Sequence, residues 1–123
     1  MIQLNLGQLI ELVKDNYDEE YDVEFDFGSF SPAGVESYRG YYNELSITFN
    51  YECNKPYMSI KDFLKMLEDS VGKSFKGYKG EDFEMGLHTP LWVSNYGMCS
   101  NTSVRGVYDT GCSLVIETRY CIN

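Results

Sequence analysis

Two segments of the chain carry apolar residues at helical spacing. In the first, Asn5 is placed to cap the N-terminus and Gln8 completes a capping-box pattern, which predicts a helix from about Leu6 to Asp15. In the second, Ser59 is placed as an N-cap and Gly72 as the end of a helix. The two apolar stripes consist of Leu6, Leu9, Ile10 and Val13, and of Ile60, Phe63, Leu64, Leu67 and Val71.

Two further segments of the first half alternate strictly between apolar and polar residues, as strands with one wet face do. They cover residues 21–27 and 45–50, and they are candidates to pair with each other. The stretch between them, residues 31–42, is rich in Gly, Pro and Ser and is expected to form a loop at one end of the sheet. The apolar faces of the two strands consist of Tyr21, Val23, Phe25 and Phe27, and of Leu45, Ile47 and Phe49.

The second half of the chain is expected to form short strands. One lies near Phe83–Met85 and another over Leu91–Asn95. A hairpin follows, built from Ser103–Tyr108 and Cys112–Arg119, with turn residues at positions 109–111. Because the strands follow one another without long crossovers, the sheet is expected to be largely antiparallel.

These elements predict an α+β fold, a mainly antiparallel β-sheet decorated by two α-helices. The length of 123 residues fits a single domain, residues 1–123, and the 43% of hydrophobic residues suffice for a modest core. No linker, internal repeat or low-complexity segment divides the chain.

The negative charge is concentrated in the first half. Residues 1–52 hold eleven Asp and Glu against two Lys and Arg, whereas residues 53–123 hold eight of each sign. Direct nucleic-acid binding is disfavoured, because neutralising phosphates requires clustered Lys and Arg. Seven carboxylates between Asp15 and Asp26 are open to three interpretations: a solvated face, a device for solubility, or an imitation of a polyanion offered to a basic protein.

Membrane attachment and metal binding are not expected. No apolar run approaches the roughly 20 residues that cross a bilayer, and residues 1–13 lack the apolar core of a secretory leader, so a cytosolic location is expected. The cysteines form no Cys-x-x-Cys pair, and with His88 as the single histidine they make a poor zinc set. We expect reduced thiols, no metal and no cofactor; the cysteines are Cys53, Cys99, Cys112 and Cys121.

Motifs for catalysis are weak. Gly72-Lys73-Ser74 resembles the end of a phosphate-binding loop, but the earlier glycine of that motif would fall at Leu67. No motif fixes a nucleophile and a base beside His88. Carboxylates at period-2 spacing on a strand point into water, which gives poor support for acid–base work. We therefore expect a protein that is not an enzyme and has no catalytic residues.

Candidate binding groups gather in glycine-bearing segments. Arg39, the one arginine of the first half, lies between tyrosines. Mixtures of aromatic, cationic and amide side chains recur over residues 75–80 and 92–97, and Arg105 lies on the predicted hairpin. A nucleotide needs this mixture, since its base stacks on aromatic rings and its phosphates accept charge-assisted hydrogen bonds.

A packing interpretation stays open for each of these groups. Arg39 has acidic neighbours with which it can pair, and such surface pairs are common. Trp92 and Tyr78 are equally suited to burial in the core or at an interface.

At these segments the chain resembles the first-described family of Thoeris anti-defense proteins, which phages encode. The motifs that carry the resemblance span most of the chain in this order: Phe25-Asp26-Phe27, Ser31-Pro32, Ser37-Tyr38-Arg39-Gly40-Tyr41-Tyr42, Gly72-Lys73, Gly77-Tyr78-Lys79-Gly80, Thr89-Pro90-Leu91-Trp92-Val93 and Asn95-Tyr96-Gly97. The family pattern has a basic residue near His88 and another near Tyr108, and this chain departs from it at both places.

The resemblance implies a sponge for an immune signal. Bacterial Thoeris defense makes a cyclic ADP-ribose isomer, such as glycocyclic ADP-ribose, and such proteins bind it in the host cytoplasm without degrading it. The resemblance also implies a homo-oligomer with nucleotide pockets near subunit boundaries, and in some members a second site for cyclic oligonucleotides. The ligand-binding residues that it implies are Arg39, Tyr41, Lys79, Trp92, Asn95 and Tyr96, to which charge and hairpin position add Arg105.

Two other functions remain open at this stage. One is an acidic inhibitor that binds a basic host protein by imitating nucleic-acid phosphates. The other is a small hydrolase acting on the same nucleotide signal.

Overall fold

The computed structural model describes residues 3–28, 30–38, 41–49, 57–77, 79–94 and 102–120, with the backbone alone described at residues 41 and 42. Along the chain these residues form the following elements: α1 (Leu6–Asp15), β1 (Asp22–Phe25), β2 (Pro32–Tyr38), β3 (Tyr41–Phe49), α2 (Ile60–Ser70), β4 (Ser74–Lys76), β5 (Asp82–Glu84), β6 (Leu91–Val93), β7 (Thr102–Asp109) and β8 (Ser113–Tyr120). The predicted α+β fold class is confirmed.

Helix α1 begins where the capping box predicts. The Asn5 side chain accepts a hydrogen bond from the Gln8 backbone N–H at 2.8 Å, and the Gln8 side chain accepts one from the Asn5 backbone N–H at 2.9 Å. This reciprocal pair satisfies two donors that a helix start otherwise leaves unpaired. All four residues of the predicted apolar stripe of α1 are buried.

Helix α2 also starts as predicted, with the Ser59 hydroxyl accepting from the Asp62 N–H at 3.1 Å. Its stripe differs from the prediction at the C-terminal end. Val71 is 38% exposed because the helix ends one residue earlier, and Ser70, 1% exposed, occupies the next buried position. Gly72 follows with a φ of +77°, a conformation that glycine adopts without strain.

Within the described residues, the main sheet has the strand order β1-β8-β7-β6-β3-β2, and β4 pairs with β5 in a small separate hairpin. The pairs β2–β3, β6–β7, β7–β8 and β4–β5 are antiparallel, while β1–β8 and β3–β6 are parallel. The mainly antiparallel sheet is thus observed with two parallel pairings that the sequence pattern did not indicate. The predicted pairing of the first two alternating segments was wrong, because β1 pairs with β8 and β3 lies between β6 and β2.

The stretch expected to form a loop instead contains strand β2. It pairs with β3 from Pro32 opposite Phe49 to Tyr38 opposite Tyr41, with irregularities near Pro32 and near Tyr38. β2 is an edge strand, and Pro32 is its first residue, a position where a missing N–H costs no ladder hydrogen bond. The polar, glycine-bearing sequence therefore suits a strand at the edge of the sheet.

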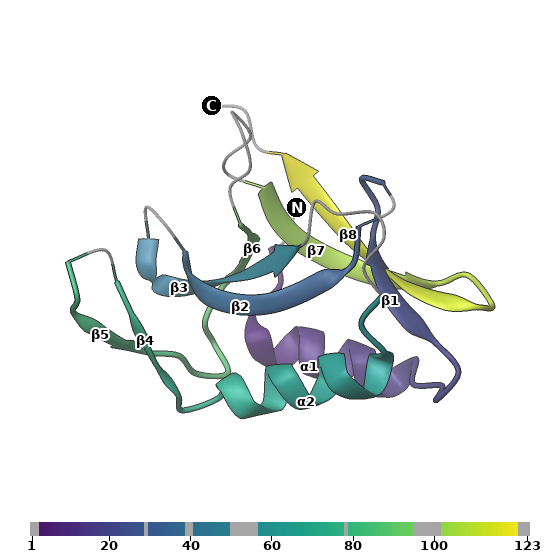
Figure 1. Cartoon of the computed structure of the whole chain (residues 1–123), viewed down its shortest axis with the longest axis horizontal. Coiled ribbons are helices and arrows are strands. Elements are labelled where there is room, and N and C mark those ends of the chain that lie inside the picture. Colours follow the sequence, from purple (N-terminus) through teal and green to yellow (C-terminus); the bar gives the residue numbers. More distant parts are fainter. Residues whose placement is uncertain are drawn as a thin grey trace.

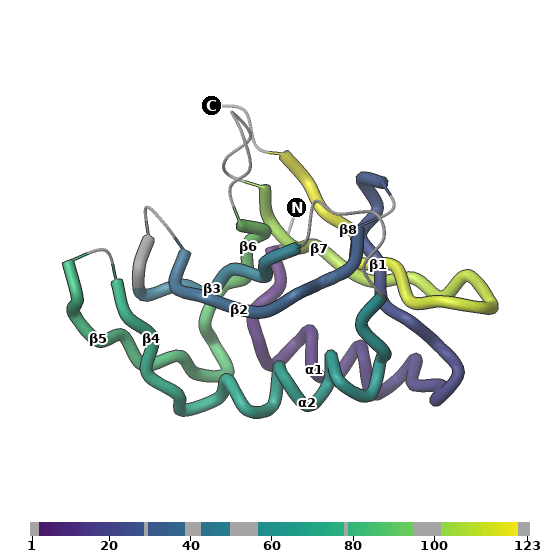
Figure 2. Tube along the Cα trace, viewed as in Figure 1, coloured from purple at the N-terminus to yellow at the C-terminus, as the bar shows by residue number. Residues whose placement is uncertain are grey.

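The helices lie side by side against one face of the main sheet, and the β4–β5 hairpin and the β7–β8 turn lie at opposite ends of the molecule (Figure 1). The trace in Figure 2 shows how strongly the sheet curves over the helices. We call the face toward the helices the inner face. It supplies the buried core together with both helix stripes, through Val23, Phe25, Leu45, Ile47, Leu91, Val93, Val104, Leu114 and Ile116.

The curvature brings the two edges of the sheet together. The Phe25 N–H of β1 donates to the Phe30 carbonyl at 2.9 Å, and the Ser31 hydroxyl donates to the Val23 carbonyl at 2.6 Å. At the other side of β1, Thr118 of β8 donates through its N–H and its hydroxyl to the two carboxylate oxygens of Asp26, at 2.9 and 2.6 Å. The Thr118–Asp26 bonds hold the end of β1 beside β8, and the bonds from Phe30 and Ser31 tie β1 to the segment before β2.

No helix in the described ranges is long and apolar enough to span a bilayer.

Candidate functional site

The face of the main sheet that turns away from the helices carries a continuous row of side chains across five strands. The strand register places Glu36 of β2 opposite Ser46 of β3, Ser46 opposite Trp92 of β6, Trp92 opposite Ser103 of β7, and Ser103 opposite Arg119 of β8. Because Leu45, Ile47, Leu91 and Val93 point into the core, their neighbours in the strands point outward. We call this face the outer face and this set the cross-strand row.

Trp92 is the centre of the row and is held from two sides. Its indole ring stacks on the ring of Tyr38, with centroids 4.6 Å apart and planes 6° apart. Its Nε1–H donates a hydrogen bond to Glu44 Oε1 at 2.7 Å. Tyr38 is 2% exposed, whereas Trp92 is half-buried, so one aromatic ring is a fixed support and the other retains exposed surface.

Hydroxyl and carboxylate groups surround the ring pair. The Ser94 hydroxyl lies 3.1 Å from Glu36 Oε1 and 3.1 Å from the Ser46 hydroxyl, and Ser46 donates to the Glu36 carbonyl at 3.2 Å. Glu36 is exposed and Glu44 is half-buried. Together, Glu36, Tyr38, Glu44, Ser46, Trp92 and Ser94 form what we call the outer-face patch.

The charge of the row changes sign from one end to the other. Glu36 stands at the β2 end, next to the patch, and the exposed guanidinium of Arg119 stands at the β8 end. With strands about 4.8 Å apart, Trp92 and Arg119 are separated by two strand spacings, about 10 Å. From β2 to β8 the row thus consists of a carboxylate, a hydroxyl, the indole, a second hydroxyl and a guanidinium. The half from Trp92 to Arg119 suits a ligand that has both an apolar ring and an anionic end.

Of the predicted ligand-binding residues, Trp92 lies at the centre of this site. Tyr41 begins β3, opposite Tyr38, and its side chain lies outside the described residues, as do Arg39, Asn95 and Tyr96. The proposed roles of these four stay predictions.

The two remaining predicted residues, Lys79 and Arg105, do not meet. Lys79 is exposed in the turn of the β4–β5 hairpin, which lies at the end of the molecule opposite the β7–β8 turn (Figure 1). Arg105 is exposed on β7, two residues beyond Ser103, at the register irregularity between Val104 and Gly106. Arg105 is thus near the row in the chain, whereas Lys79 belongs to a different part of the fold.

The sequence analysis missed most members of the site, among them Glu36, Tyr38, Glu44 and Arg119. A signal for Glu44 was present, because it alternates with Leu45 and so shares a face with Ser46. No local pattern indicates that β2, β3, β6, β7 and β8 are neighbours in this order, and the other three residues join the site only through that order.

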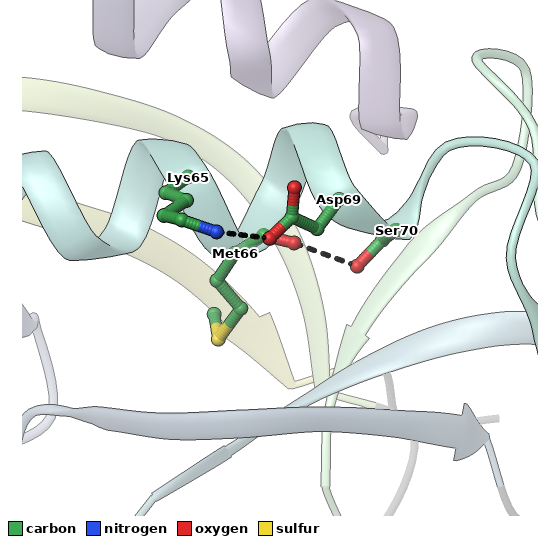
Figure 3. A network of polar contacts seen from close by, with 4 residues as sticks. All are labelled: Lys65, Met66, Asp69 and Ser70. Carbon is green, nitrogen blue, oxygen red and sulfur yellow. Dashed lines mark hydrogen bonds and ion pairs between the residues drawn. The ribbon is translucent and has the colours of Figure 1, made fainter.

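A hollow of about 310 Å³ lies between α2 and β2 and is lined by Lys65, Met66, Asp69, Ser70 and Lys73 among others. Its polar groups are already engaged, as Figure 3 shows: Lys65 Nζ lies 2.8 Å from Asp69 Oδ2, and the Ser70 hydroxyl donates to the Met66 carbonyl at 2.8 Å. The hydrogen bond to Asp69 raises the pKa of Lys65. Lys73 Nζ lies over the Phe75 ring, 5.3 Å from its centroid. An anion in this hollow would have to compete with these contacts.

Another hollow, of about 540 Å³, runs beside the start of α1 and is mostly apolar, with Leu4, Leu12, Leu87 and His88 in its lining. The first N–H groups of the helix are not available to a ligand. The Leu6 N–H donates to the Thr89 carbonyl at 2.9 Å, and the Gly7 N–H donates to the Leu87 carbonyl at 2.8 Å. The start of α1 is therefore hydrogen-bonded to the segment before β6 and does not present these two N–H groups to a ligand.

In the part of the chain that the structure describes, no three His, Cys, Asp or Glu side chains are grouped as the ligands of a metal ion. Comparison with protein-family models, with curated proteins and with solved structures finds no significant match to this chain.

Proposed function

We propose that this protein binds and sequesters a small cyclic nucleotide signal of the cyclic ADP-ribose type without degrading it. The observation that carries the proposal is the Trp92 ring, which is supported by Tyr38, oriented by Glu44 and placed in a row that ends at Arg119. The resemblance to the Thoeris anti-defense family supports the choice of signal and a role in the host cytoplasm during infection.

The chemistry of the row supports a nucleotide better than an apolar ligand. A base stacked on an aromatic side chain contributes about 1–3 kcal/mol to binding. Because Trp92 is already oriented by Tyr38 and Glu44, little side-chain freedom is lost when a ligand stacks on it. A phosphate at the β8 end would accept charge-assisted hydrogen bonds from Arg119.

Sequestration demands tight binding and no turnover. Nanomolar affinity corresponds to about 12 kcal/mol. At about 0.3 kcal/mol for each non-hydrogen atom, a ligand of dinucleotide size reaches that value. The amount of signal removed is then set by the amount of protein, since each site holds one ligand for a long time.

The proposal includes a homo-oligomer with ligand sites near subunit boundaries. Two exposed tyrosines, Tyr108 near the β7–β8 turn and Tyr120 at the far end of β8, support this proposal, because tyrosine is enriched in interfaces. Their exposed fractions are 46% and 48%.

The test is to incubate the purified protein with glycocyclic ADP-ribose, remove unbound ligand, denature the protein by heat and analyse the released small molecule. Intact ligand recovered in stoichiometric amount supports the sponge. Recovery of a chemically altered ligand would favour a hydrolase over the sponge. The absence of any retained ligand would overturn the proposal.

A second candidate function, the acidic inhibitor, is favoured by one observation. Of the seven carboxylates from Asp15 to Asp26, all but Glu24 are exposed in the described structure. If this surface imitates nucleic-acid phosphates, the triple variant Glu19→Gln, Glu20→Gln and Asp22→Asn loses inhibition of the host defense while still retaining the nucleotide. Under the sponge proposal the same variant inhibits normally.

A further inference from the structure

The edge strand β2 runs beside helix α2 and contacts it (Figure 1). The hollow of about 310 Å³ lies between these two elements, with Val35 supplied by β2 and Met66 by α2. Both side chains are half-buried and pack against the core. The hollow therefore has an apolar part, and one of its sides is the edge of a sheet.

The backbone groups of Val35 face that edge. In an antiparallel pair, successive residues direct their N–H and carbonyl alternately toward the partner strand and away from it. The Ser46 hydroxyl of β3 donates to the Glu36 carbonyl at 3.2 Å, which places this carbonyl on the β3 side of β2. The N–H and carbonyl of Val35 then point to the other side, and within the described ranges no segment other than β3 is hydrogen-bonded to Val35. A strand edge of this kind is a template for one further strand.

The charges that line the hollow cancel. Two acids, Asp62 and Asp69, stand against two bases, Lys65 and Lys73. Lys65 lies 2.8 Å from Asp69, and the charge of Asp62 also favours its protonated form. A neutral lining with an apolar part gives no preference for an anion or a cation, and it suits an uncharged backbone that carries an aliphatic side chain.

We propose that the groove between β2 and α2 binds an extended peptide segment of a partner protein, which adds a strand to the edge of β2 at Val35 and inserts an aliphatic side chain beside Met66. The peptide residue opposite Val35 exchanges backbone hydrogen bonds with it. Its side chain lies on the same face of the sheet as that of Val35, so it enters the hollow. In this mode of recognition the main chain supplies affinity and the side-chain pocket supplies specificity.

A single strand fits this edge better than a second copy of the sheet. Irregularities near Pro32 and near Tyr38 confine the regular part of β2 to residues 34–37. A second copy would also bring its own α2 to the same edge, whereas a peptide brings no helix. The inference is independent of the proposed function, because Val35 faces the hollow beside α2 while Trp92 belongs to the outer face.

The partner is unidentified, so the probe is a displayed library of random heptapeptides, panned on the immobilised full-length protein. An excess of the Met66→Glu variant in solution removes peptides that bind elsewhere. We expect the enriched sequences to share one aliphatic residue flanked by polar residues. No enrichment over the unselected library would overturn the inference.

The most enriched sequence is then synthesised and added to isotope-labelled protein for NMR. We expect hydrogen exchange of the Val35 amide to slow when the peptide binds. Methylation of the peptide backbone nitrogen at one position should weaken binding about two- to tenfold, the loss of one hydrogen bond. Chemical-shift changes confined to elements other than β2 and α2 would contradict the assignment.

Three variants locate the site. Met66→Glu places a charge in the apolar part of the hollow and should weaken binding of the peptide about tenfold or more. Val35→Thr keeps the branched shape on β2 and should weaken it severalfold, which serves as the test if Met66→Glu fails to fold. Lys61→Gln changes an exposed residue of α2 outside the lining of the hollow and should leave the affinity unchanged. Equal affinities in all three variants would overturn the inference.

Sedimentation of the protein without peptide tests the other occupant. We expect Met66→Glu to leave the oligomeric state of the protein unchanged. An oligomer that this substitution dissociates would mean that a second copy occupies the edge of β2, and it would overturn the peptide proposal.

Discussion

Tyr38 reaches across β3 to stack on Trp92. The two residues belong to β2 and β6, which are not neighbours in the sheet, and their rings nevertheless lie 4.6 Å apart and nearly parallel. The stack therefore ties the edge strand β2 to the interior of the sheet over the outer face, in addition to the backbone ladder with β3.

This tie makes Tyr38 important for stability as well as for the site. We predict that Tyr38→Ala lowers the free energy of unfolding by about 3 kcal/mol, the usual cost of removing a buried aromatic side chain. Tyr38→Phe keeps the ring and should stay within about 1 kcal/mol of the parent protein. Urea unfolding followed by Trp92 fluorescence measures both; similar losses in the two variants would show that the hydroxyl, rather than the stack, is what matters.

Two arginines, Arg105 and Arg119, are candidates to bind the phosphate of the ligand. Charge and hairpin position indicate Arg105, whereas the strand register puts Arg119 in the same row as Trp92. We predict that Arg119→Gln weakens binding of AMP about tenfold or more while leaving adenosine nearly unaffected, because only AMP carries the phosphate. Calorimetric titration of both ligands against Arg119→Gln and Arg105→Gln decides between them, and a loss confined to Arg105→Gln would contradict the register argument.

Much of the local structure was readable from the sequence, because it depends on neighbouring residues. The bounds of α1 follow from the Asn5–Gln8 capping box and four apolar positions, all within ten residues of chain. The β7–β8 hairpin was predicted for the same reason, since Asp109, Thr110 and Gly111 supply the turn. The sequence pattern also gave the buried face of β1 correctly, through Val23 and Phe25.

Strand order was not readable, and the site depends on it. Alternation says which face of β1 or β3 is buried, but any strand with a compatible face can be its neighbour. Strand β2 was missed because an edge strand containing Pro32 and Gly34 has the composition of a loop. Glu36, Glu44 and Arg119 come together with Trp92 only after β2, β3, β6, β7 and β8 have been placed in order.

The stability of the protein is expected to depend on pH through a contact between Tyr21, next to β1, and Asp109, next to the β7–β8 turn. Tyr21 is 9% exposed, and its hydroxyl donates to Asp109 Oδ1 at 2.7 Å. This hydrogen bond, followed by burial and the charge of Asp109, raises the pKa of Tyr21 from 10.0 to about 12. The folded state holds this proton more tightly than the unfolded chain, so the contribution to stability is complete below pH 10 and is lost as the pH rises toward 12.

The measurement compares the melting temperature of the parent protein with that of Tyr21→Phe as a function of pH, because the variant keeps every other ionisable group. We predict that the parent protein is the more stable of the two at pH 8 and that the difference shrinks between pH 10 and pH 12. A difference that stays constant over this range would mean that the Tyr21 hydroxyl is not protonated preferentially in the folded state.

The central claim is that a cyclic nucleotide signal binds tightly over Trp92. It is tested most directly by titrating glycocyclic ADP-ribose into the protein at micromolar concentration while following the fluorescence of this single tryptophan. We predict a linear change that stops sharply at a fixed ratio of ligand to protein, as binding at nanomolar affinity requires. A fluorescence that does not change, or that changes only gradually up to millimolar ligand, would contradict the claim.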